Sequence, residues 1–204
     1  VNKALAEGTV PDGVELVMVL APADLDEKQV FALDQFLMQG GTVVIATGNY
    51  AARLDQQALT ANAQVSGLAD WLEHHGVRLG EGMVMDPQNA AFPAPVTRQV
   101  GGFSFQELVM RDYPSFIDGR GAGLDPDNGI PARLPQVTVP WASPLEVEVP
   151  AESARRVTRL LTSSERSWIS TDPDVMPRID ESGSSGFRPE GAQQIGRASC
   201  RERV

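Results

Sequence analysis

The chain has 204 residues, of which 42% are hydrophobic and 22% are charged, so it is long enough to bury one hydrophobic core. Its formal net charge of −10 argues against nucleic-acid binding and anionic-membrane binding, because both need clustered Lys and Arg. The longest strongly apolar stretch, Leu16 to Ala23, is much shorter than the roughly 20 residues that a membrane-spanning helix needs.

The two ends of the chain indicate that its native part is a piece of a longer protein. The chain opens with Val1-Asn2-Lys3 and has neither an initiator Met nor a signal peptide. Residues 195–204 look like the translation of a sequencing-library adapter, and we expect this tail to be non-native; the alternative is a genuine basic tail. Setting aside its three arginines and one glutamate reduces 17 basic and 27 acidic residues to 14 and 26. It also removes Cys200, the only cysteine, so no disulfide or cysteine-based site is predicted.

The first predicted elements are a strand, a helix and a second strand. The apolar run Val14–Leu20 predicts a strand that is covered on both faces. Asp26 and Gln29 have the spacing of a capping box, which predicts the start of a helix with one apolar face. The Gly40–Gly41 pair predicts its end, and Thr42–Thr47 predicts the second strand. This order predicts a βαβ unit with parallel strands and a right-handed crossover.

The next segments have weaker patterns. Residues 50–64 are rich in Ala and Gln and are predicted to be loop with some helix. Apolar residues within 68–72 predict a short helix that ends at His75-Gly76. Short strands or extended connections are predicted at Val77–Leu79 and Met83–Asp86.

Residues 87–135 are rich in Pro and Gly, which predicts an irregular insertion on the core and not a separate domain. Within it, Val100–Met110 predicts a hairpin that turns at Gly101-Gly102. Three further strands are predicted near residues 136–139, 145–149 and 156–161. Ser182–Gly186 has the composition of a flexible loop.

The order of several segments resembles the GldG-like proteins, the auxiliary components of gliding-motility-type ABC transport systems. The resemblance rests on ordered similarity and not on a catalytic signature. It is carried, in chain order, by Leu25–Ile45, Leu72–Leu79 leading to Val84–Pro87, Tyr113-Pro114, Pro140–Pro144, and Val157–Ser164 leading to Trp168.

The resemblance implies a domain similar to the glutamine amidotransferases but without their catalytic residues. The expected fold class is α/β, with a parallel, flavodoxin-like or glutamine-amidotransferase-like sheet, helices on both faces and the inserted region. We expect one such domain over residues 1–194. The resemblance also implies a place on the extracytoplasmic (periplasmic) face of the bacterial cytoplasmic membrane, through membrane segments missing from this sequence. It implies permease and ATPase subunits, or another auxiliary subunit, as partners.

The sequence offers no recognisable catalytic residue, and we do not expect an enzyme. An amidotransferase-type hydrolase needs a nucleophile on a tight turn after a strand, with a His held nearby. The two turns after the predicted strands, Ala21–Asp24 and Thr47–Tyr50, contain neither Cys nor a Ser between glycines. Gly183–Gly186 is interpreted as a loop because no strong strand precedes it.

Neither a metal nor a cofactor is predicted. His74 and His75 are adjacent on a helix and point about 100° apart, so they do not readily bind one metal together. A His at a helix end interacts favourably with the helix dipole, which explains these residues without a metal. Asp125–Gly129 resembles a calcium loop but lacks its spacing and its terminal Glu. No phosphate-binding loop is present, so the energy for transport must come from another subunit.

A ligand site is predicted only from topology, because ligands of parallel sheets bind beyond the carboxyl ends of the strands. The polar residues nearest those ends are Asp24, Asn49, Asp86, Gln88 and Ser143. Two functions remain: an interaction module, and an unrecognised or degenerate amidotransferase-like or glycoside-acting hydrolase. A hydrolase would have a deep pocket with a perturbed acid or base, whereas a binding module would have a shallow apolar patch or sheet edge.

Overall fold

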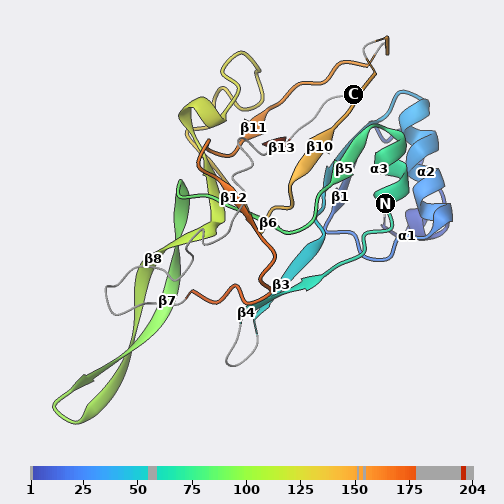
Figure 1. Ribbon diagram of the computed structural model, residues 1–204. Helices are drawn as coiled ribbons and strands as arrows, with labels where there is room; N and C mark the ends of the chain where they lie inside the picture. The colour runs from blue at the N-terminus through green and yellow to red at the C-terminus, as the bar shows by residue number, and fades with distance from the viewer. Residues whose placement is uncertain (1, 55–58, 151, 154, 178–198, 201–204) are drawn as a thin grey trace.

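A computed structural model describes residues 2–54, 59–150, 152–153, 155–177 and 199–200 (Figure 1). Its elements in chain order are α1 (Asn2–Ala6), β1 (Leu16–Leu20), α2 (Glu27–Met38), β2 (Thr42–Ala46), β3 (Tyr50–Leu54), β4 (Leu59–Ala63), α3 (Ala69–His74), β5 (Val77–Leu79), β6 (Met83–Met85), β7 (Asn89–Val100), β8 (Phe103–Gly119), the 3₁₀ turn η1 (Gly121–Gly123), β9 (Val137–Pro140), β10 (Leu145–Val147), β11 (Leu161–Thr162), β12 (Trp168–Ser170) and β13 (Ser199–Cys200).

The N-terminal part forms the predicted βαβ unit. β1 pairs in parallel with β2 along the full length of both strands. At the start of α2, the Gln29 backbone N–H donates to Asp26 Oδ1 at 2.8 Å, and the Asp26 backbone N–H donates to Gln29 Oε1 at 3.0 Å. After α2 the chain passes through Gly40 at a φ of 91°, a conformation that glycine adopts without a steric penalty. The capping box, the glycine stop and the parallel pairing are therefore confirmed.

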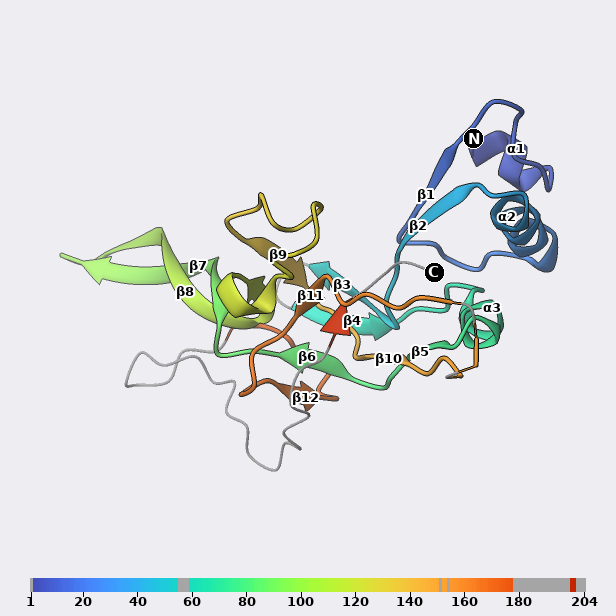
Figure 2. The same cartoon turned by 90° about the horizontal axis from the view of Figure 1, so that it is seen from above.

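Helix α2 covers only one face of the β1–β2 pair (Figure 2). Val17 and Val19 of β1 are buried in the core cluster that α2 helps to form. On the opposite face Leu16, Met18 and Leu20 are exposed by 49%, 58% and 63%. The prediction that this strand is covered on both faces is wrong, because the described part of the chain supplies no second layer.

The remaining pairs are antiparallel, so the predicted parallel fold class is wrong. Strands make up 41% and helices 14% of the structure, and β1–β2 is the one parallel pair among the described residues. The sheets are small and contain two or three strands each. A parallel pair needs a long crossover, which α2 provides between β1 and β2, whereas β7 and β8 are separated by two residues. The strands that the structure describes form neither a flavodoxin-like nor a glutamine-amidotransferase-like parallel sheet.

The antiparallel body, from β3 to β12, combines two pairs of consecutive strands, β3–β4 and β7–β8, with short strands that pair with distant partners. β5 pairs with β10 and β6 pairs with β12, which confirms the short strands predicted at Val77–Leu79 and Met83–Asp86. Its core contains the fully buried side chains of Met83 and Tyr113. The strand predicted near residues 156–161 is mostly absent from the described residues. Only the two-residue β11 forms there, and it begins at residue 161.

Residues 50–64 were predicted to be loop with some helix, and this is wrong. Within this segment, Tyr50–Leu54 and Leu59–Ala63 form the β3–β4 pair, in which Tyr50 lies opposite Ala63. Leu59 and Ala61 of β4 are buried against the core of the body. Burial in a tertiary contact therefore overrides the helix propensity of an Ala- and Gln-rich segment.

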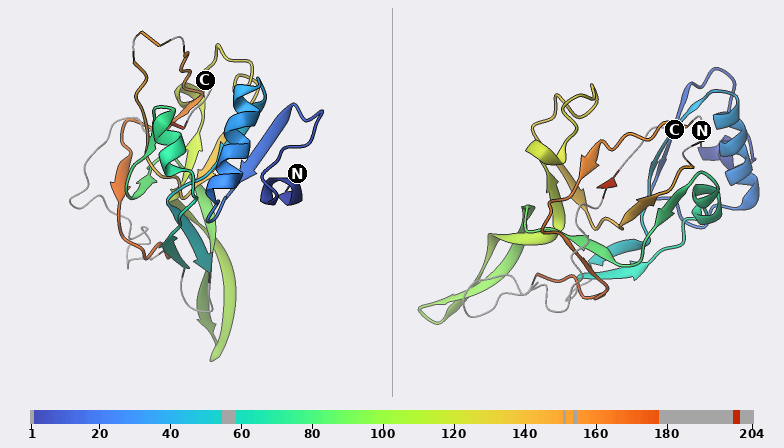
Figure 3. Two further views of the ribbon diagram at one scale, coloured as in Figure 1. Left: turned by 90° about the vertical axis from the view of Figure 1, so that its right-hand side faces the viewer. Right: turned by 45° about the horizontal axis from the view of Figure 1, so that its top comes forward.

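β7 and β8 form a long hairpin that projects from the body in each view (Figures 1 and 3). The strands pair up to Val100 opposite Phe103, which confirms the predicted turn at Gly101-Gly102. Both turn glycines have positive φ values, 61° and 88°, as a type I′ turn requires. The base of β8 also pairs with β9, over Phe116–Gly119. We call the projecting part, residues 93–110, the hairpin arm.

Two features concern the chain ends. The loop predicted at Ser182–Gly186 lies outside the described residues. β13, within the tail predicted to be non-native, pairs with β11.

None of the helices in the described ranges combines the length and the apolar character of a membrane span.

Candidate functional site

The five residues predicted at the strand ends do not form one site. Two of them, Asn49 and Ser143, contact each other. The Asn49 backbone N–H donates to Ser143 Oγ at 2.9 Å. The Asn49 side-chain Nδ2 donates to the carbonyls of Leu79, at 3.4 Å, and Gly80, at 3.0 Å. Asn49 therefore joins the end of β2 to the end of β5, and its side-chain donors bond to the protein itself.

Asp24 lies at the carboxyl end of β1 and is exposed to solvent. The backbone N–H of Asp24 donates to the Val65 carbonyl at 2.9 Å. The backbone N–H of Gln64, the residue before Val65, donates to the Asn49 carbonyl at 2.8 Å. Asp24 and Asn49 therefore contact the same short segment. Ala21 and Asp24 have φ values of 44° and 51°, which strain residues other than glycine.

The strained turn after β1 is the place where a hydrolase of the alternative class would carry its nucleophile. Here the residue that follows the strand is Ala21, and Pro22 and Ala23 come next. The side chains of these three residues carry no nucleophile, acid or base. The position that would carry the nucleophile therefore holds no reactive group, and the nearest carboxylate, Asp24, is exposed to solvent.

Asp86 and Gln88 belong to a second cluster, in which Asp86 is completely buried. Asp86 Oδ1 accepts from the Ser164 hydroxyl at 2.6 Å and from the Gln88 N–H at 2.8 Å. Asp86 Oδ2 accepts from the Ser164 N–H at 2.6 Å. Gln88 Nε2 donates to the Asp118 carbonyl at 2.6 Å, and the Asp118 carboxylate pairs with Arg120 at 2.5 Å. A buried carboxylate with three donors is well satisfied, so we interpret this cluster as a structural tie.

Sequence reasoning missed Ser164, Asp118 and Arg120 as partners of this cluster. Ser164 lies 78 residues from Asp86 in the chain, and no local pattern links the two. The one available signal was the Ser-rich segment after β11, where Ser163 and Ser167 are also buried and lie 2.9 Å apart through their hydroxyl oxygens.

Both histidines of the sequence lie at the end of α3. His75 is buried, and its ring contacts Trp71 edge-on with centroids 4.6 Å apart. Trp71 Nε1 donates to Asp34 Oδ1 at 2.9 Å, and His75 Nε2 lies 3.7 Å from the same oxygen. Burial, followed by the charges of Arg155 and His74, lowers the pKa of His75 from 6.5, against the opposing effect of Asp34. His75 is therefore a packing residue between α2 and α3.

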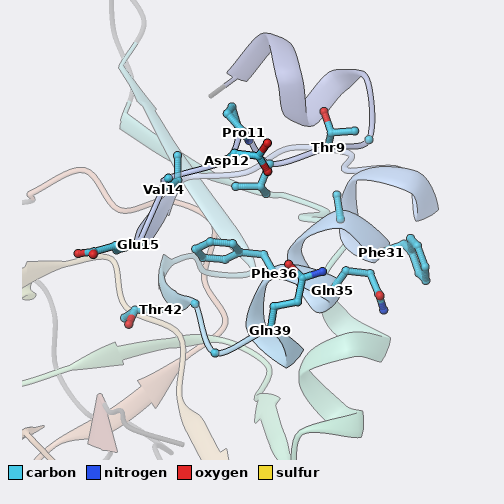
Figure 4. A pocket seen from close by; sticks show the side chains of 16 residues that line it. Thr9, Pro11, Asp12, Val14, Glu15, Phe31, Gln35, Phe36, Gln39 and Thr42 are labelled. Carbon is cyan, nitrogen blue, oxygen red and sulfur yellow. The ribbon is translucent and has the colours of Figure 1, made fainter.

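A pocket of about 710 Å³ lies between residues 8–15 and α2 (Figure 4). Its polar side chains include Asp12, Glu15, Gln35 and Gln39, and its lining contains no His, Cys, Ser, Lys or Arg. It opens at the amino ends of β1 and β2, whereas ligands of parallel strands bind at the carboxyl ends. None of the five predicted residues lines it. Across the described ranges, no three His, Cys, Asp or Glu side chains gather as a metal centre would require.

Comparison with known proteins places the chain in a family. A curated relative from Borreliella burgdorferi, described as an uncharacterized protein, is 23% identical over 159 residues, which is 78% of this chain. The chain spans 29% of the length of that relative. No solved structure matches the chain. The family described as "ABC-type uncharacterized transport system" matches residues 3–186, and the chain therefore belongs to this family of ABC transport auxiliary proteins.

Proposed function

We propose that this domain is a non-catalytic, partner-binding part of an ABC transport auxiliary protein, on the extracytoplasmic face of a bacterial cytoplasmic membrane. The proposal depends on one observation: the polar groups at the strand ends form hydrogen bonds with other groups of the same protein. Asn49, Ser143, Asp86 and Gln88 form hydrogen bonds within the protein, at distances of 2.6 to 3.4 Å. A site that converts a small substrate needs such groups aimed into an enclosed cavity.

The contact most similar to a catalytic pair is the bond between Ser164 and Asp86. In a serine hydrolase the hydroxyl proton is taken by an imidazole, which a carboxylate then orients. Here the hydroxyl donates directly to the buried carboxylate, and the same serine also donates its backbone N–H. His75, at the end of α3, faces Trp71 of the same helix and Asp34 of α2. This geometry supports a structural bond and not a nucleophile with its base.

The surface that we assign to the partner is the uncovered side of the βαβ unit. It consists of Leu16, Met18, Leu20 and Val44, which are 40% to 63% exposed, and we call it the open face. Burying such side chains contributes roughly 1.5–3 kcal/mol each, and monomeric proteins rarely expose large contiguous patches of them. The net charge of −10 favours a protein partner over anionic lipid. We therefore assign the open face to a protein subunit of the transport system, either the permease or another auxiliary subunit.

The location and the narrower family assignment are also part of this proposal. The GldG-like, gliding-motility-type assignment is supported by the ordered segments from Leu25–Ile45 to Val157–Ser164, all within the family match. In such a system the ATPase supplies the energy, and this domain contributes recognition.

The substitution Met18→Lys tests the open face. Lys at this position places a charge in the buried interface, and we expect co-purification with the permease and ATPase of the same system to weaken at least about tenfold. The thermal midpoint should not change, because Met18 is already 58% exposed in the domain. Phe31→Lys is the matched control, because Phe31 is 62% exposed but lies on α2, away from the open face. Retained binding by the Met18→Lys protein would contradict the assignment.

The absence of catalysis has its own test. A serine-reactive fluorophosphonate should leave Ser164 unlabelled, because its hydroxyl bonds to a buried carboxylate and no imidazole activates it. Labelling that disappears in Ser164→Ala would favour the hydrolase alternative.

A further inference from the structure

The hairpin arm is an apolar and neutral projection on an acidic protein. Arg98 and Glu107 are the two charged residues between Pro93 and Met110, and they pair with each other at 2.9 Å. The exposed apolar side chains of the arm, 56% to 71% accessible, are Val100, Phe103, Phe105, Leu108 and Met110. An isolated two-stranded hairpin is only marginally stable in water, so a surface of this kind gains stability from being covered.

A lipid bilayer does not fit the arm. Hydrocarbon would leave the unpaired backbone groups of both strand edges without hydrogen bonds, at a cost of several kcal/mol per group. The arm also has no excess of Lys or Arg to attract anionic headgroups. Another β-strand satisfies both the backbone edge and the apolar side chains, which favours a protein.

The outer edge of β7 is closed to such a strand by two prolines. Val100 and Phe103 face each other across a two-residue turn, which makes them a hydrogen-bonded pair. Every second residue of β7 from Val100 back therefore directs its N–H toward β8, and the residues between them face outward. Pro93 and Pro95 occupy outward positions, so the N–H groups that they lack are those that a neighbouring strand would need.

The outer edge of β8 is open by the same reasoning. Its outward positions are Ser104, Gln106, Leu108 and Met110, and β8 has no proline between Phe103 and Asp112. At the base of the hairpin β9 already pairs with this edge, over Phe116–Gly119. Among the described strands, none continues that pairing along the arm. The edge is therefore a sheet edge that β9 occupies only in part.

We propose that β8 of the arm pairs with β8 of a second copy of this chain, antiparallel and about a two-fold axis at Leu108. An axis one residue earlier would place Glu107 opposite Glu107 of the other copy, and like charges directly opposite each other are destabilising. An axis at Leu108 pairs that residue with its own copy and Met110 with Gln106, so Leu108 and Met110 of both arms lie on one face of the shared sheet, and Phe103 and Phe105 of both arms lie on the other. This inference goes beyond the proposed function, which concerns the open face.

The charge distribution supports a second copy as the occupant. Two copies of net charge −10 repel each other, but the arms themselves are neutral. Overlap of the two β8 strands over Ser104–Asp112 holds the bodies about 30 Å apart, which is several times the Debye length of about 8 Å at physiological salt. The arm tip lies far from α1 and α2 in every view (Figures 1 to 3). Pairing through the arms therefore avoids most of the repulsion between the bodies.

Sedimentation of the full chain over a range of concentrations tests the proposal. We expect a reversible dimer, and we expect Leu108→Pro to raise its dissociation constant at least about tenfold, because proline removes an outward N–H of β8. Thr97→Pro is the matched control, because it removes an outward N–H on the edge of β7 that Pro93 and Pro95 already close. It should dimerise as the unsubstituted chain does, and so should Met18→Lys on the open face.

A cross-linking experiment covers the possibility that the proline variants misfold. In a Cys200→Ser background, Leu108→Cys should form an intermolecular disulfide under mild oxidation, whereas Thr97→Cys should not. An unsubstituted chain that sediments as a monomer at every soluble concentration overturns the proposal, and so does equal cross-linking at the two positions. Loss of dimerisation in Leu108→Pro with retained partner binding would separate this inference from the proposed function.

Discussion

The βαβ unit and the antiparallel body are stabilised over very different distances in the sequence. In the βαβ unit the capping box joins Asp26 to Gln29, three residues apart, and α2 lies between the two strands that it covers. In the body, Asn49 bonds to Ser143 across 94 residues, and Asp86 bonds to Ser164 across 78. The unit can therefore form from neighbouring signals, whereas the body closes only when the late part of the chain has returned to the early part.

The largest expected effect comes from cutting a long-range tie of the body. Asp86→Ala removes the acceptor of three hydrogen bonds and leaves the Ser164 hydroxyl, the Ser164 N–H and the Gln88 N–H unsatisfied. Because each unsatisfied buried donor costs about 1–3 kcal/mol, we expect the free energy of unfolding to fall by about 3–5 kcal/mol, measured by urea denaturation. Asp12→Ala, at an exposed carboxylate, should change it by less than about 0.5 kcal/mol. If the two variants were equally stable, the body would not depend on this tie.

A smaller loss of stability is expected when the capping box of the βαβ unit is removed. Asp26→Ala removes the acceptor for the Gln29 N–H at the start of α2, and loss of such a cap costs about 1 kcal/mol. Asp26→Ser keeps an acceptor and should recover most of the loss. Urea denaturation followed by circular dichroism measures both variants. A loss as large as that of Asp86→Ala would remove the contrast between the two regions.

The smallest effect is expected where the two regions meet, at His75 between α2 and α3. Its pKa in the folded protein is below 6.5, chiefly because of burial, so the unfolded chain binds the proton more readily. The stability that depends on neutral His75 is therefore fully present above about pH 6.5 and decreases as the pH falls through this value toward the folded-state pKa.

Unfolding measured between about pH 5 and 8 checks this sign. The His75→Gln protein should lose less stability than the unsubstituted protein as the pH falls. Asp34→Asn removes the charge that raises the pKa of His75, so it should make the loss steeper. A flatter profile for Asp34→Asn would show that Asp34 does not act on His75 in this way.

The same contrast explains how much of the fold could be predicted from the sequence. The capping box, the Gly40 stop and the turn at Gly101-Gly102 depend on adjacent residues, and all three were predicted correctly. The β3–β4 pair was not predicted, because Leu59 and Ala61 face a core that Met83 and Tyr113 complete from later in the chain. The pairing of β6 with β12 also depends on residues far apart, so no local pattern indicates it.

The candidate site was predicted incompletely for a related reason. The rule of strand carboxyl ends assumes one parallel sheet whose strands end at the same edge. In this structure β5 pairs antiparallel with β10, and β6 pairs antiparallel with β12. Ser143, just before β10, and Asp86, just after β6, therefore lie at the ends of strands from two different sheets. The rule named Asn49, Ser143 and Asp86 only as candidate ligand residues; it indicated neither the bonds that they make within the protein nor the partner Ser164.

The two prolines of β7 also limit how large an assembly can become. When two arms join through β8, each outermost strand is a β7 that carries Pro93 and Pro95 on its free side. Growth by further strands, as in amyloid fibrils, then finds two missing donors at each end of the sheet. A long apolar hairpin can therefore form a dimer without forming larger assemblies. A third molecule would have to pair with a β7 edge that lacks two of the N–H donors it needs.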